Sequence, residues 1–170
     1  MRFVRCTPIL ASLCLLLASC SDSTAPTDKN DDKNNQPLTA STVTMKVNGT
    51  VWTSQIVQIQ SNLYTAASGN SSGTSGSSLY MTLDKITAMG DVPFNSKSGS
   101  GAHASAYYTT LNTTTGQSTM YLKIVEDGTA KFTVTTLTDS EMRGTFNCTL
   151  EASGGEVVTI TDGVFAFKLK

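Results

Sequence analysis

The chain has 170 residues and a formal net charge of −1, and 15% of its residues are charged. Lys and Arg do not cluster with aromatic residues, so nucleic acid is not an expected partner. Four cysteines and one histidine limit the chemistry that the chain could perform. Abundant Ser, Thr, Gly and Asn are typical of an extracytoplasmic β-protein, and the length suits one domain.

Residues 1–19 have the features of an export signal. Two arginines precede an apolar run, residues 9–17, which is shorter than the roughly 20 residues that span a bilayer. At its end the chain reads Leu17-Ala18-Ser19-Cys20, the large-small-small-Cys order of the bacterial lipobox, with Cys20 just after the signal. This order predicts cleavage between Ser19 and Cys20 and acylation of Cys20. The alternative is an ordinary secretory signal with a chance cysteine.

The predicted anchor indicates where the protein is held. A diacylglycerol and an N-acyl chain, of the palmitate type, would hold Cys20 firmly, whereas one chain binds only reversibly. The next residue is Ser21, so the aspartate that often retains lipoproteins at the inner membrane is missing. We therefore expect a lipid-anchored protein of the bacterial cell envelope, at the outer membrane, facing the periplasm or the cell surface.

Residues 20–41 read as the lipidated cysteine and a disordered tether, because they contain too few apolar side chains to offset the cost of ordering. Their acidic residues resemble the surface-export signal of Bacteroidota lipoproteins, and a solvated linker is the alternative. Asp22-Ser23-Thr24 also resembles the O-glycosylation acceptor of these bacteria, with Ser23 as the acceptor, although so short a motif also arises by chance.

Residues 42–170 read as a single all-β domain. Asn48-Gly49 between apolar runs predicts a hairpin, and other runs are separated by Gly, Asn and Asp turns. The spacing predicts an antiparallel β-sandwich or barrel-like domain of about 8–10 short strands. Residues 51–60 read as one apolar run, and several other runs alternate apolar and polar residues and should each bury the apolar face: Leu79, Met81 and Leu83; Met120, Leu122 and Ile124; Phe132 and Val134; Phe146, Cys148 and Leu150; Phe165, Phe167 and Leu169.

Few residues could support catalysis or bind metal. His103 is the only histidine, and a hydrolase would have to use it, but a lone histidine at a strand start is more often a surface or edge residue. Cys148 should point inward and act as a small hydrophobe, and after signal removal it is the one thiol besides Cys20. No disulfide, metal site or cofactor is therefore expected. The acidic residues read as turn formers or surface charge: Asp127, Asp139, Glu141 and Asp162.

Tyr107 and Tyr108 are candidate ligand contacts. Neighbouring residues on a strand face opposite sides, so one of the two tyrosines should be partly exposed. The tyrosines and Trp52 could form a sugar-stacking platform, although such residues more often fill a β-core.

The order of the motifs resembles a known family. Met45-Lys46-Val47-Asn48-Gly49-Thr50-Val51-Trp52 opens the domain, and Arg143-Gly144-Thr145-Phe146-Asn147 and a segment around Asp162-Gly163 close it. These features look like the small Bacteroidota lipoproteins with the domain of unknown function numbered 6252. The resemblance implies an all-β surface domain without an established activity. In it, Gly49 would serve a tight turn, Trp52 the core, Gly144 a bulge and Gly163 a turn.

Three classes of function remain open on the sequence. The first is a non-catalytic surface module that binds a glycan, a peptide or an envelope protein. The second is a structural or inhibitor-like accessory protein, with residues 68–78 and 96–101 as contact loops. The third is a hydrolase using His103. The lack of an acid–base or metal cluster favours the first two.

Overall fold

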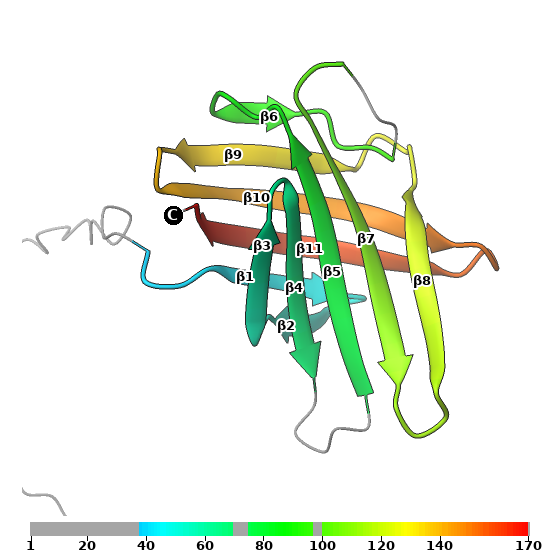
Figure 1. Ribbon diagram of the computed structural model, residues 1–170. Coiled ribbons are helices and arrows are strands. Elements are labelled where there is room, and N and C mark those ends of the chain that lie inside the picture. The colour runs from blue at the N-terminus through cyan, green and yellow to red at the C-terminus, as the bar shows by residue number, and fades with distance from the viewer. Residues whose placement is uncertain (1–37, 70–74, 97–99, 170) are drawn as a thin grey trace, which may run out of the picture. The chain divides into compact units, whose positions relative to one another are not determined.

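The computed structural model describes residues 38–69, 75–96 and 100–169, and these residues form strands and no helix. The strands pair antiparallel in one curled sheet of half-barrel form, which confirms the predicted all-β, barrel-like class (Figure 1). The described residues contain eleven strands: β1 Thr42–Val47, β2 Thr50–Thr53, β3 Ile56–Gln60, β4 Leu63–Gly69, β5 Ser75–Asp84, β6 Gly90–Val92, β7 His103–Asn112, β8 Gln117–Ile124, β9 Lys131–Leu137, β10 Glu141–Ala152 and β11 Val157–Lys168.

The sheet folds over on itself as two layers whose strands cross in Figure 1. The first layer contains β1, β2, β6, β9, β10 and β11, and the second contains β3, β4, β5, β7 and β8. The layers join where the end of β10 pairs with β8. The face of the second layer that is turned away from the core is called its outer face below.

The predicted run over residues 51–60 is divided between two edges of the sheet. β2 is at one end of the strand order and β3 is at the other. Ser54 allows this crossing, because its Oγ accepts a hydrogen bond from the Val43 N–H at 2.9 Å and its own N–H donates to the Val43 carbonyl at 2.9 Å. The apolar pattern of residues 51–60 therefore predicted strand correctly, but it did not predict that the chain passes from one layer to the other between β2 and β3.

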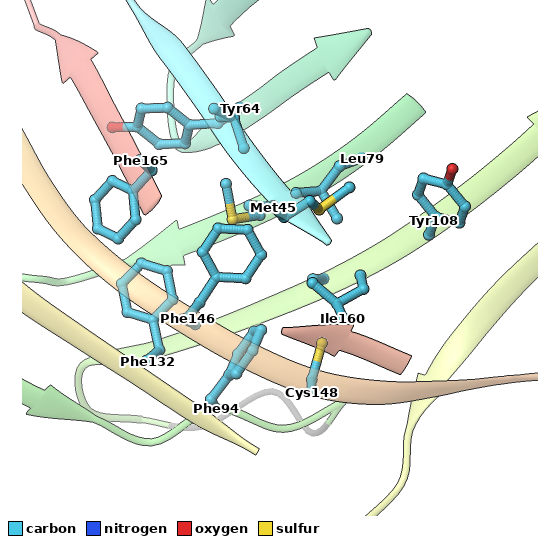
Figure 2. Packing of buried hydrophobic residues seen from close by; sticks show 14 of the residues in the cluster. Met45, Tyr64, Leu79, Phe94, Tyr108, Phe132, Phe146, Cys148, Ile160 and Phe165 are labelled. Atoms are coloured by element: carbon cyan, nitrogen blue, oxygen red, sulfur yellow. The ribbon is translucent and has the colours of Figure 1, made fainter. Parts of the chain in front are cut away.

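The core lies between the layers and is rich in aromatic rings (Figure 2). Phe132 stacks on Phe165 at a centroid distance of 4.8 Å, and Phe165 stacks on Phe167 at 5.0 Å. Phe167 in turn stacks on Tyr64 of the second layer at 4.4 Å. This row of rings holds the two layers together, because each pair adds contact energy to the burial of its apolar area.

The glycines of the resemblance have clear structural roles. Asn48 and Gly49 have φ values of 48° and 80° in the β1–β2 turn, as a tight hairpin requires. Gly144 lies where the register between β9 and β10 shifts, so the predicted bulge is confirmed. The predicted turn at Gly163 is wrong: Asp162, with φ of 51°, and Gly163 form a bulge within β11, opposite β1 and β10.

Replacement of Gly144 by Ala should strongly destabilise the domain. The new Cβ would overlap the Thr133 carbonyl and lie 2.5 Å from a ring carbon of Phe165. We expect G144A to lower the free energy of unfolding by about 3 kcal/mol or to prevent folding. Urea denaturation followed by circular dichroism measures this change. In the control G154A nothing lies within 4 Å of the new Cβ, and stability should be nearly unchanged. Equal stability of the two variants would contradict this packing.

Candidate functional site

Tyr107 and Tyr108 project from β7 to opposite sides of the second layer, as the alternation predicts. Tyr108 is 4% exposed and points into the domain, whereas Tyr107 is half-buried on the outer face. Tyr107 pairs across the strands with Tyr80, and their rings stack at 4.4 Å and 6°. Burial raises the pKa of Tyr107, and the neighbouring Tyr80 raises it further, so the Tyr107 hydroxyl is neutral at physiological pH.

A groove of about 500 Å³ lies on the outer face next to this tyrosine pair. Its walls include Ile56 of β3, Leu111 of β7 and Met120 of β8, with exposed fractions of 59%, 43% and 47%. Hydroxyl and amide groups lie between these apolar side chains. The lining residues are Gln55, Ile56, Gly76, Ser77, Ser78, Tyr80, Thr109, Thr110, Leu111, Ser118 and Met120. Ligand sites in proteins commonly combine a mainly apolar lining with a few polar groups in this way.

The expected burial of Met120 and Leu122 is wrong, and the outward position of Met120 gives the groove one of its apolar walls. The register between β8 and β10 shifts near Leu122, so that Ile124 is buried while Met120 and Leu122 face outward. Tyr121 takes the inward side instead and lies against Tyr108 at a centroid distance of 6.3 Å. The alternation along β8 showed that one face of the strand is apolar, but it did not show whether that face points to the core or to the outer face of the layer.

Charged residues are distributed unequally between the two layers. No residue between Lys46 and Asp84 in the sequence is Asp, Glu, Lys, Arg or His, and this stretch includes β2, β3, β4 and nearly all of β5. The first layer contains ion pairs, such as Lys46 Nζ with Asp162 Oδ2 at 2.8 Å and Arg143 Nη2 with Glu141 Oε2 at 3.0 Å. The uncharged stretch is visible in the sequence, but the prediction of strands considered only the alternation of apolar and polar residues and did not consider the absence of charge.

A second, more polar pocket of about 400 Å³ lies at the same end of β5, β7 and β8. Ser77, Tyr108 and Thr110 contribute to its lining. Ser77 Oγ accepts a hydrogen bond from Trp52 Nε1–H at 2.7 Å and also interacts with the Tyr108 hydroxyl. These contacts fix Ser77 and Tyr108 and give Trp52 its predicted place in the core, where it is 8% exposed.

His103 begins β7, as expected, but it is buried, with 8% of its surface exposed, and not a surface residue. Its Nδ1 lies 3.4 Å from the Gly101 carbonyl oxygen and 3.9 Å from Asp84 Oδ2. Within the described part of the chain, no serine hydroxyl makes a hydrogen bond with this ring. The geometry thus does not assemble the Ser-His pair that nucleophilic attack would need.

Three of the four acidic residues expected in turns or as surface charge have partners in the structure. Asp127 Oδ1 accepts hydrogen bonds from the N–H and hydroxyl of Thr129 in the predicted turn. Asp162 pairs with Lys46. Glu141 is largely covered, not a freely solvated charge, and its contact with Arg143 lowers its pKa. Among the residues that the structure describes, no three His, Cys, Asp or Glu side chains come together as a metal site.

Several predicted sites cannot be located. Ser19, Cys20 and Ser23 lie outside the described residues. In the described part of the chain, no helix is long and apolar enough to cross a membrane. Comparisons with protein-family models, with curated proteins and with solved structures gave no match. The resemblance to the lipoprotein family therefore remains a prediction.

Cys148 should not react in the folded protein. It is 2% exposed, and burial raises the pKa of its thiol to about 12, so the thiolate that attacks alkylating agents is scarce at pH 8. We expect iodoacetamide at pH 8 to modify Cys148 only after denaturation, as peptide mapping by mass spectrometry would show. Rapid modification of Cys148 in the folded protein would contradict the assigned burial.

Proposed function

We propose that this protein is a lipid-anchored, non-catalytic interaction module that binds an uncharged partner in the groove on its outer face. The observation that supports the proposal most directly is the coincidence of exposed Ile56, Leu111 and Met120 with a layer nearly free of charge. The centres of protein interfaces are similarly depleted of charged residues. An exposed apolar patch that folding does not require commonly marks a binding surface.

The groove favours a peptide partner over a glycan. Sugars bind well against exposed aromatic faces, but Tyr80 and Tyr107 each cover a face of the other. The remaining apolar walls are aliphatic, from Ile56, Leu111 and Met120. Because no charged side chain among the described residues lines the groove, its chemistry fits an uncharged segment of another envelope protein with apolar side chains. Ser78, Thr109 and Ser118 provide hydroxyls for its polar groups.

The proposed anchor follows from the sequence. The lipobox at residues 17–20 would place three acyl chains on Cys20, and the polar residues that follow would separate the domain from the headgroups. Ser21 after the cysteine supports delivery to the outer membrane. Such an anchor would confine the groove to the envelope and raise its effective concentration toward partners held there.

Photo-crosslinking tests the groove. A photoreactive amino acid in place of Met120 in the full chain should crosslink, in cells, to one protein through an uncharged, apolar-rich segment. Leu111→Lys should lower the yield about tenfold, because it places a charge in the contact. The control position is Val157, which is 56% exposed on the first layer and should give no specific product. Equal products from both positions, or an adduct with the mass of a glycan, would refute a peptide partner.

Metabolic labelling tests the anchor. Cys20→Ala should abolish incorporation of labelled palmitate, because no other residue in the lipobox provides the required thiol. Cys14→Ala, which removes another cysteine of the same segment, should leave labelling intact. Labelling that persists in C20A would show that Cys20 is not the acylation site, and secretion of the chain without a label would support an ordinary secretory signal.

A further inference from the structure

In the part of the chain that the structure describes, the β3 edge of the second layer lacks the usual protection against pairing with another strand. β3 pairs with β4 in a regular register from Ile56 to Gln60, and its other edge is the end of the strand order. The strand contains no charged residue, no proline and no bulge. Proteins commonly protect exposed edges with a charged residue, a proline or a bulge, because free N–H and C=O groups are a template for pairing.

β2 and β6, two other edge strands of the sheet, are less suited to pairing. β2 has four residues, and Lys46, paired with Asp162, lies directly opposite Val51. β6 has three residues, one of which is Asp91 in an ion pair with Lys131. β3 is longer and uncharged, and it exposes 59% of Ile56 and 36% of Ile59. Pairing along β3 would therefore cover apolar surface without burying a charge.

We propose that two copies of this chain associate through antiparallel pairing of their β3 strands about a two-fold axis at Gln58. Directly opposite residues in an antiparallel pair face the same side, so the register must match inner with inner and outer with outer residues. Centring on Gln58 satisfies this rule and uses all of β3. Val57 then lies opposite Ile59 of the second copy on the inner face, and Ile56 lies opposite Gln60 on the outer face.

The pairing would join the two second layers into one continuous sheet, with both outer faces on the same side. β3 and β4 contain no charged residue, so the paired strands bring no like charges together at the axis. Gln60 of one copy would lie beside Ile56, which lines the groove of the other copy. An edge of this length buries less than the roughly 800 Å² per partner of a standard interface, so a dissociation constant in about the micromolar range is expected.

Sedimentation of the full chain with Cys20→Ala, at about 5 to 500 µM, tests the dimer. The C20A chain should show a monomer–dimer equilibrium. Gln58→Lys and Gln58→Glu should each weaken dimerisation about tenfold or more, because each places like charges opposite one another at the axis. An equimolar mixture of the two variants should recover association, since opposite charges then face each other. Gln117→Lys, the same change on exposed β8 of this layer, is the control and should behave like the parent chain.

The outcomes separate this proposal from alternatives. Gln58 is exposed, so unchanged thermal unfolding of its variants would show that they remain folded. A chain that stays monomeric over the whole range, or a dimer that Q58K leaves intact, would overturn the proposal. Dimerisation that both Q58K and Q117K weaken would also overturn it, because a general charge effect would then explain the loss. None of these results depends on the groove, whose partner is tested by crosslinking at Met120.

Discussion

Two glycines on neighbouring strands lie under phenylalanine rings of the opposite strand, and the curvature of the domain depends on this packing. Gly144 of β10 pairs with Phe165 of β11, and Phe146 of β10 pairs with Gly163 of β11. A Cβ on either glycine would overlap the ring across from it and a backbone carbonyl. The rings therefore sit directly on the backbone, and the sheet can carry two bulges here without opening a void.

This packing also explains how the core and the surface of the first layer fit together. The bulge at Asp162 and Gly163 turns Asp162 toward Lys46 on β1, while Phe165 and Phe167 remain fully buried. Phe167 stacks on Tyr64, which brings the second layer over the first. An exposed ion pair of this kind adds little stability to the first layer, whereas the buried contact of Phe167 with Tyr64 lies between the layers and helps to hold them together.

The sequence predicted the class of the fold and much of the core from alternation alone, because Leu79, Phe132, Phe146 and Phe165 are buried where the pattern placed them. It could not predict where the chain changes layer at Ser54, since β2 and β3 have similar apolar patterns. It also could not predict that Met120 faces outward, because that depends on a register shift with β10, far away in the sequence. The partial exposure of one tyrosine of the pair Tyr107 and Tyr108 could be predicted from strand alternation alone. The groove beside Tyr107 could not, because its walls come from strands that are distant in the sequence.

The surfaces of the two layers differ in their content of charged side chains. The first layer places charges, together with exposed valines such as Val157, outside an aromatic core. The second layer buries inner-face residues such as Leu79 and Met81, and its outer face combines exposed Met120, Leu122 and Ile56 with hydroxyls and nearly no charge. Folding does not require these outward side chains, because they contribute nothing to the core. In our proposal these side chains serve contacts outside the domain, and the same absence of charge would favour both an uncharged ligand in the groove and a second copy at β3.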